Sequence, residues 1–124
     1  MKKSVKSLRK KLKDTIREYV RLRDEDTCQM CGAVVYGSNS HPSHVKPVST
    51  HSHLQYDENN IKILCMSCHR NWHLDPTKST KWFKMRFPVR FEYLEKEGYK
   101  VHSWKTWELE GLIEIYQQKI KERK

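Results

Sequence analysis

Two pairs of cysteines constrain this chain more than any other feature of its sequence. Cys28 and Cys31 form one Cys-x-x-Cys pair, Cys65 and Cys68 form the second, and 33 residues separate the two pairs. Thiolates on two such knuckles can complete a tetrahedron around one zinc ion, whereas two disulfides or a redox pair are the alternatives. Both pairs have the same two-residue spacing and the N-terminus shows no secretion signal, so a structural zinc is the favoured interpretation.

The length and composition of the chain indicate one small domain. A chain of 124 residues is typical of a single domain, and hydrophobic residues make up 36% of it. Such a chain buries a modest core, which a bound metal would stabilise. No apolar run approaches the length of a transmembrane helix, so we expect a soluble cytoplasmic protein without a membrane partner. The aromatic residues expected to anchor the core, rather than to stack on bases, are Trp72, Trp82, Phe83, Trp104 and Trp107.

Positive charge is concentrated at the N-terminus. The formal net charge is +10, and residues 1–23 contain ten Lys or Arg against two acidic residues, a net +8. Such a concentration favours a polyanionic partner, usually nucleic acid, although a solubilising face or a loose basic tail has the same composition. The residues predicted to contact nucleic acid are Lys2, Lys3, Lys6, Arg9, Lys10, Lys13 and Arg17.

Apolar residues near the N-terminus recur at helical spacing. They predict an amphipathic helix over residues 5–22, with the basic residues on its remaining faces. Such a helix can pack through its apolar stripe and still present positive charge to a partner. The predicted stripe consists of Val5, Leu8, Leu12, Ile16 and Tyr19.

The rest of the chain predicts a pair of short strands followed by helices. Pro76 must end the helix that follows the second cysteine pair, and Ser67 is the expected N-terminal cap of that helix. The expected elements are strands at about 41–45 and 61–64, a helix from the second cysteine pair to Pro76, and helices at about 78–86, from Pro88 to Gly98 and from Thr106 onward.

Two histidines follow the second cysteine pair directly. His69 and His73 are four residues apart, so on a helix they share one face and can hold one metal ion distinct from the cysteine zinc. The alternative is a histidine that is stacked in the core or exposed. His51 and His53 lie in the expected loop and could contact phosphate, but we favour inert side chains; His102 lies outside the motif and is expected to be structural.

Taken in order along the chain, these motifs resemble a known family of enzymes. The stretches "RDEDTCQMCG", "HVKPVST", "DENNIKILCMSCH" and "RNWH" cover roughly residues 23–75. Their pattern of Cys-x-x-Cys-Gly, His-Val-x-Pro and Asn-Ile-x-x-Leu-Cys-x-x-Cys-His is similar to that of the HNH, or ββα-metal, endonucleases that carry a four-cysteine zinc site. The segment from "KWFKMRFPVRFEYLE" onward resembles the helical extension of phage NinG-like recombination nucleases.

The resemblance implies an α+β fold in one domain, residues 1–124. Its centre would be a small ββα-metal core over residues 23–75, stapled by the four-cysteine zinc. An N-terminal basic amphipathic helix, residues 1–22, and a C-terminal helical extension, residues 76–124, would flank this core. The cell in which it acts would be a bacterium or a phage-infected host.

The resemblance also implies a metal-dependent DNA endonuclease. His44 matches the general base of the family, and imidazole suits this role because its pKa lies near working pH. Asn60 matches the central asparagine that orients the loop or the base histidine; an ordinary turn or cap residue is the alternative. His69 matches the ligand of a divalent metal, and His73 matches the second helical ligand of some members. A non-catalytic, zinc-stabilised DNA-binding module is the alternative function.

The sequence departs from the family at Ser43. Many members place an acidic residue or a histidine just before the base as a metal ligand, and serine is a poor ligand. In one interpretation His69 and His73 hold the metal with water and phosphate; in a second His41 lends a nitrogen; in a third the site is weakened or inactive. We favour the first, and nitrogen-rich ligation shifts the preference from Mg²⁺ towards Mn²⁺, Ni²⁺, Co²⁺ or Zn²⁺. The oligomeric state, monomer or homodimer, is left open.

Overall fold

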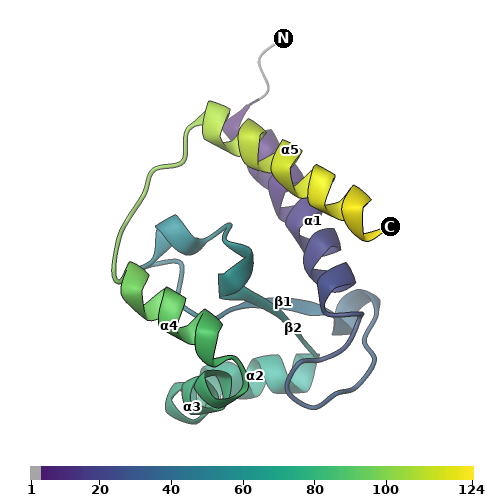
Figure 1. The fold of residues 1–124 in the computed structure, drawn as a ribbon, viewed down its shortest axis with the longest axis vertical. Helices are drawn as coiled ribbons and strands as arrows, with labels where there is room; N and C mark the ends of the chain where they lie inside the picture. Colours follow the sequence, from purple (N-terminus) through teal and green to yellow (C-terminus); the bar gives the residue numbers. More distant parts are fainter. Residues whose placement is uncertain (1–3) are drawn as a thin grey trace.

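A two-stranded sheet lies between a pair of long helices and a group of three shorter ones (Figure 1). Residues 4–124 are described, from a computed structural model of the chain. Lys2 and Lys3, which are predicted to contact nucleic acid, lie outside the described residues. The mixture of helices and a small sheet confirms the expected α+β class. The elements are α1 (Val5–Arg23), η1 (Gly37–Asn39), β1 (His41–His44), η2 (Ser52–Leu54), η3 (Glu58–Asn60), β2 (Ile61–Leu64), α2 (Met66–Leu74), α3 (Pro76–Arg86), α4 (Pro88–Glu97) and α5 (Thr106–Arg123).

The two long helices, α1 and α5, lie side by side and run in the same direction (Figure 1). The Ser4 hydroxyl caps α1 by accepting a hydrogen bond from the Ser7 amide at 3.1 Å. Val5 is 42% exposed, so the predicted apolar stripe is wrong at that residue, because the buried stripe begins one turn later at Leu8. The buried residues are Leu8, Leu12, Ile16, Tyr19 and Val20 of α1, and Leu109, Ile113, Tyr116 and Ile120 of α5.

The two strands pair in antiparallel register and lead directly into α2. His41 lies opposite Leu64 and His44 lies opposite Ile61, so both predicted strands are confirmed to within a residue. The N-terminal cap of α2 is Cys65, whose Sγ accepts a hydrogen bond from the Cys68 amide at 3.3 Å. The predicted cap Ser67 is wrong because it already lies inside α2, whereas Cys65 has extended backbone geometry.

Prolines and a glycine set the limits of α3 and α4. The Asp75 carboxylate caps α3 by accepting from the Lys78 amide at 3.2 Å, and Pro76 occupies the first helical position. The helix therefore begins two residues earlier than predicted. α4 ends at the predicted Gly98, which has a φ of 61°, a left-handed conformation that glycine adopts without the steric penalty of a Cβ.

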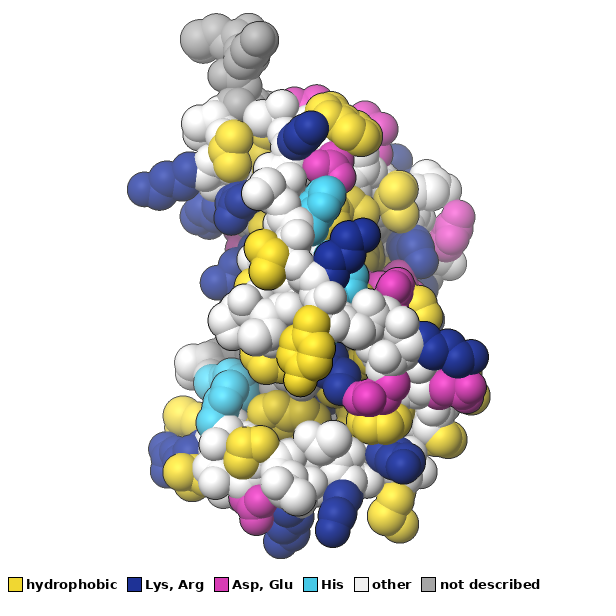
Figure 2. All heavy atoms as spheres, turned by 90° about the vertical axis from the view of Figure 1, so that its left-hand side faces the viewer, with side chains coloured by type: hydrophobic (Ala, Val, Ile, Leu, Met, Phe, Trp, Pro, Cys, Tyr) yellow, Lys and Arg dark blue, Asp and Glu magenta, His cyan; other side chains and the backbone are white. Residues whose placement is uncertain are grey.

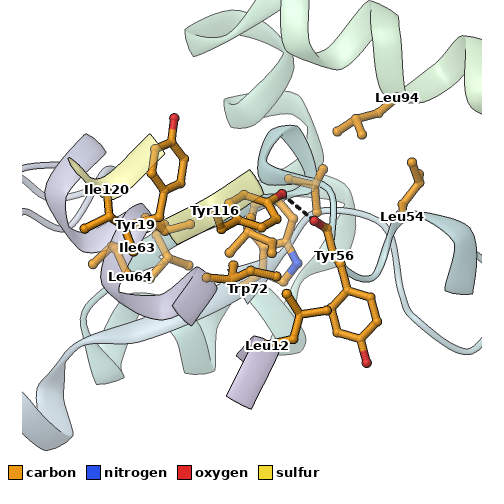
Figure 3. Packing of buried hydrophobic residues seen from close by; sticks show 14 of the residues in the cluster. Leu12, Tyr19, Leu54, Tyr56, Ile63, Leu64, Trp72, Leu94, Tyr116 and Ile120 are labelled. Carbon is orange, nitrogen blue, oxygen red and sulfur yellow. Dashed lines mark hydrogen bonds between the residues drawn. The ribbon is translucent and has the colours of Figure 1, made fainter. Parts of the chain in front are cut away.

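One cluster of buried side chains joins the helices to the sheet (Figure 3). Trp72 and Phe83 are buried in this cluster, and Trp82 and Trp104 are partly buried against it, as predicted. Trp107 is 69% exposed, so its predicted role in the core is wrong, because the first turn of α5 presents it to solvent. Among the described residues, no helix is both long and apolar enough to span a bilayer.

Candidate functional site

The four cysteines converge as the sequence predicts. Their Sγ atoms all lie within 4.8 Å of one another, and Cys31 Sγ lies 3.9 Å from Cys65 Sγ. A tetrahedral zinc with Zn–S bonds of about 2.3 Å separates its sulfur ligands by about 3.8 Å. All four cysteines are free thiols, and Cys28, Cys65 and Cys68 are buried. The cluster therefore fits a structural zinc ion.

Backbone amides support the thiolates that zinc would need. Cys31 N lies 3.5 Å from Cys28 Sγ, and Cys68 N lies 3.3 Å from Cys65 Sγ. Burial acts to raise the pKa of the Cys28 thiol, but hydrogen bonds from nearby backbone amides outweigh it and lower this pKa to about 7. A thiol that ionises near neutral pH is ready to act as a metal ligand.

A buried carboxylate ties the first cysteine knuckle to the sheet. Asp24, at the end of α1, accepts a hydrogen bond from Ile63 N at 2.9 Å, and Gln29 N donates to Ile63 O at 2.9 Å. Arg23 pairs with Asp24 at 2.9 Å and also donates to Ile61 O at 2.6 Å. The cluster and these contacts together join α1, β2 and α2 at one point.

Three histidines form a row beside the cysteine cluster. His41 Nε2 lies 2.8 Å from Ser38 O, His41 Nδ1 lies 2.9 Å from His69 Nδ1, and His69 Nε2 lies 3.2 Å from His73 Nε2. Because a carbonyl only accepts hydrogen bonds, His41 carries its proton on Nε2 and accepts through Nδ1. His69 then donates from Nδ1, which leaves the lone pair of its Nε2 directed towards His73.

The row brings two ring nitrogens to the separation of neighbouring metal ligands. The Nε2 atoms of His69 and His73 are separated by 3.2 Å, which matches two neighbouring ligands of one ion at about 2.1 Å from each. His41 approaches the opposite nitrogen of His69, so it cannot reach that position without turning a ring. Burial, and then the nearby His41 and His73, lower the pKa of His69, which favours the neutral imidazole that a metal requires.

His44 stands at the end of β1 with one ring nitrogen occupied. Its Nε2 lies 3.0 Å from the backbone carbonyl of Gln55, so Nε2 carries the proton and Nδ1 has the free lone pair. Burial lowers the pKa of His44, and the positive charges of Lys62 and Lys13 lower it further, although the hydrogen bond to Gln55 acts in the opposite direction. At neutral pH the ring is therefore a neutral base with a defined tautomer.

Asn60 holds the loop that follows His44. Its side chain is fully buried, Oδ1 accepts from Lys46 N at 2.7 Å, and Nδ2 donates to Lys46 O and to Leu54 O, each at 3.2 Å. The cap of η3 is Asp57 rather than Asn60. Of the predicted functions for this asparagine, its contacts therefore correspond to orienting the loop, and they are made with the backbone.

Ser43 is buried and hydrogen-bonded to a buried lysine. It is 1% exposed, and its Oγ accepts from Lys62 Nζ at 3.0 Å. Lys62 is itself fully buried, with Nζ 3.5 Å from the centre of the Trp72 ring, and burial lowers its pKa well below the usual range. The side chain of residue 43 is therefore occupied by the buried amine of Lys62 and supplies no acidic ligand.

A groove of about 760 Å³ brings the histidines and the N-terminal helix together. His41, His44 and His69 line it on the sheet side, and Arg9, Lys10, Lys13 and Arg17 line it from α1. Lys6 is exposed on α1 but does not line this groove.

Two of the four basic residues in the groove are already engaged. Arg17 donates to Gly37 O at 3.1 Å and to Ser40 O at 3.0 Å, so it holds the segment before β1. Lys10 pairs with Asp14 at 3.1 Å.

Three residues at the site were missed by the sequence analysis. Gln55 acts through its backbone carbonyl, so its side chain gives no signal. Lys62 and Asp24 are charged residues of kinds that usually lie on the surface, and only the folded structure shows that they are buried. The alternation of Lys62 with Ile61 and Ile63 in a short strand is the closest signal, and it indicates an outward side chain instead.

Replacing Cys28 with serine should remove zinc and the cooperative unfolding transition. Structural zinc contributes about 10–16 kcal/mol of apparent binding free energy in zinc-finger peptides, whereas small domains are stable by about 5–15 kcal/mol. We expect tightly bound zinc in the unaltered protein and in Met66→Ser, an exposed neighbour of the cluster, by elemental analysis. If Cys28→Ser unfolded at the same temperature as the unaltered protein, that result would contradict a structural zinc.

Comparison with models of known protein families identifies the family of this chain. A family model described as the bacteriophage lambda NinG protein matches residues 1–124. Searches of curated proteins and of solved structures found no match. Because the family match extends over the whole chain, this protein belongs to the family of the bacteriophage lambda NinG protein.

Proposed function

We propose that this protein is a metal-dependent endonuclease of the HNH type that nicks DNA. The observation that carries the proposal is that His44 and His69 line the same groove as the basic side chains of α1. The sheet side supplies a neutral base, His44, and one of the two proposed metal-binding imidazoles, His69, whereas His73 does not line the groove; the helix side supplies positive charge. This combination suits phosphodiester hydrolysis, which needs an activated water, stabilisation of developing negative charge and a bound polyanion.

In the proposed reaction His44 is the general base. Its Nδ1 takes a proton from a water molecule, and the resulting hydroxide attacks the phosphorus of a DNA phosphate. The Gln55 carbonyl, which accepts from Nε2, then faces an imidazolium and stabilises it. The bond between phosphorus and the 3′ oxygen breaks, and the leaving oxygen takes a proton from a solvent water, which gives a 5′-phosphate and a 3′-hydroxyl.

The proposed metal ligands are the Nε2 atoms of His69 and His73. A divalent ion held there would stabilise the negative charge on the phosphate and on the leaving oxygen. His41 serves this site from the other side, because accepting the Nδ1 proton of His69 fixes the tautomer that keeps His69 Nε2 free. Asn60 serves the base by holding the loop that carries Gln55.

The DNA is proposed to lie along the groove beside α1. With Arg17 and Lys10 engaged in other contacts, Arg9 and Lys13 are the proposed phosphate ligands. Figure 2 shows the face that carries α4 and the segment after it, where Lys and Arg side chains are interspersed with Asp and Glu. A surface of mixed charge offers a polyanion no continuous positive field, which favours the groove instead.

The proposed substrate class is phage or recombination DNA, including branched DNA. This rests on membership of the NinG family and on the resemblance of the C-terminal extension to phage recombination nucleases. Lysine and arginine contacts to phosphate position a protein on DNA without reading its sequence. We therefore propose recognition through the DNA backbone.

A zinc-stabilised DNA-binding module without catalysis is the second candidate. The burial of Ser43 favours it, because no acidic ligand then joins the metal position from β1. Both candidates require zinc and DNA binding. In the nuclease, His44 is needed for nicking and is dispensable for DNA binding. In the non-catalytic module, His44 has no part in nicking.

The substitution His44→Ala tests the nuclease directly. We expect nicking of supercoiled plasmid to fall by about 10²- to 10⁴-fold, the usual contribution of a general base, with DNA affinity and zinc content unchanged. Because the pKa of His44 is lowered, the base is deprotonated at neutral pH, and the acid limb of the rate in the unaltered protein should lie below pH 6.5. Equal nicking by both proteins would support the non-catalytic module.

The metal preference follows from the ligand set. Imidazole ligands favour Mn²⁺ and Ni²⁺ over Mg²⁺, and the side chain of residue 43 supplies no carboxylate. We expect faster plasmid nicking with Mn²⁺ or Ni²⁺ than with Mg²⁺ at equal concentration. His73→Gln should weaken this difference, and a Mg²⁺ optimum in the unaltered protein would count against the proposed ligands.

Two lysine substitutions distinguish DNA binding along the groove from DNA binding on the outer face of α1. Lys13 lines the groove beside His44, whereas Lys11 is exposed elsewhere on the same helix. Each phosphate contact contributes about 0.9 to the slope of log K against log salt for duplex DNA. Lys13→Gln should reduce the steepness of the slope by about this amount and Lys11→Gln should not; equal effects would refute binding along the groove. Deleting α1 is unsuitable because its buried residues belong to the core.

A further inference from the structure

We propose that the C-terminal extension positions the general base, with Trp104 and Tyr116 as positioning residues. This inference rests on the proposed function, because it assigns these two side chains to the alignment of His44. Neither side chain lines the groove, so neither is expected to touch DNA. Both act on the loop between β1 and β2, which supplies the carbonyl that His44 needs.

The loop depends on side chains for its shape. Between the strands, residues 45–60 contain no regular element except two short 3₁₀ helices, η2 and η3. Three carbonyls surrounding that of Gln55 each receive a side-chain donor from a different part of the chain. Trp104 Nε1 donates to Ser52 O at 2.9 Å, and Asn60 Nδ2 donates to Leu54 O at 3.2 Å. The hydroxyl of Tyr116 on α5 donates to Tyr56 O (Figure 3).

The segment between α4 and α5 fastens the first half of the loop. His102 N donates to Ser52 Oγ at 2.7 Å, and Ser52 Oγ lies 3.3 Å from His102 O. Lys100 N donates to Thr50 O at 3.2 Å, and His53 Nδ1 lies 3.0 Å from Lys100 O. Residues 100–104 therefore run along the loop as a strap, held by one backbone hydrogen bond and by the side chains of Ser52, His53 and Trp104.

The strap is in turn attached to α5 and to the core. His102 Nε2 lies 2.8 Å from a carboxylate oxygen of Glu108 in the first turn of α5. The Trp104 ring packs edge to face on Tyr56, with centroids 5.2 Å apart, and Tyr56 lines the groove. His102, predicted to be structural, thus connects the extension to the loop beside His44.

These contacts control where the Gln55 carbonyl lies. This carbonyl fixes both the tautomer and the direction of the His44 ring. Losing a flanking donor would leave the loop free to shift, and a displacement of about 1 Å in a catalytic group can cost roughly 10²-fold in rate. The loss should appear in kcat, because phosphate binding by α1 does not involve the strap.

The test compares three conservative substitutions in the same extension. Trp104→Phe and Tyr116→Phe each keep an aromatic ring and remove one hydrogen-bond donor to the loop. Trp107→Phe is the matched control, because Trp107 is 69% exposed in the first turn of α5. Two readouts are used: nicking kinetics, and the ¹⁵N NMR signals of the His44 ring, which report its tautomer without any need for catalysis.

We expect the first two variants to lose tenfold or more in kcat, with KM and DNA affinity unchanged, and to show a mixed His44 tautomer. Trp107→Phe should match the unaltered protein in both readouts. An unchanged tautomer in both Trp104→Phe and Tyr116→Phe would overturn the inference, as would equal losses in all three variants. Absence of nicking by the unaltered protein would instead count against the proposed function, and the NMR comparison would still decide the positioning.

If Tyr116→Phe fails to fold, Ser52→Ala replaces it. This variant removes the hydroxyl that accepts from His102 N and leaves α5 intact. A loss of the single His44 tautomer in Ser52→Ala and Trp104→Phe, with the thermal midpoint kept, supports the strap. Retention of that tautomer in both variants overturns it.

Discussion

The convergence of four thiols is the contact on which the rest of the structure depends. Cys65 is both a member of the cluster and the N-terminal cap of α2, so the position of the cluster sets the direction of that helix. The same helix carries His69 and His73, and the first knuckle is bonded to β2 through Gln29, whose N donates to Ile63 O at 2.9 Å. A metal ion that fixes the four sulfurs would therefore also fix the histidine row relative to β1, which no single apolar contact in so small a core could do.

Positive charge around the histidines has a chemical consequence for His44 itself. Lys62 lies buried behind β1, and Lys13 faces His44 from α1; both lower the pKa of His44 in the same direction as burial does. A histidine in such surroundings remains neutral at neutral pH and can accept a proton. Ser43 takes part in this arrangement, because its hydroxyl accepts a hydrogen bond from the buried Lys62 Nζ at 3.0 Å.

The features that sequence predicted well are those determined locally. The helix over 5–22, both strands and the end of α4 at Gly98 follow from periodicity and from backbone preferences, and the cysteine cluster follows from its spacing. The errors at Val5, Ser67 and Trp107 arose where tertiary packing or cap geometry decides. The bonds of the Arg17 guanidinium to two carbonyls before β1 were not predicted for the same reason. Backbone groups such as the Gln55 carbonyl give no sequence signal at all.

The candidate site includes more of the chain than the segment that carries its sequence motifs. Residues 23–75 contain His44, Asn60 and His69, yet the groove beside them needs α1 as its second wall. The loop that orients His44 receives hydrogen bonds from the strap and from α5. Since α1 and α5 also pack against each other, a change in either helix would reach the site through two routes, the groove wall and the loop. The terminal helices are therefore components of the candidate site: α1 forms the basic wall of the groove, and α5 supports the loop whose Gln55 carbonyl lies beside His44.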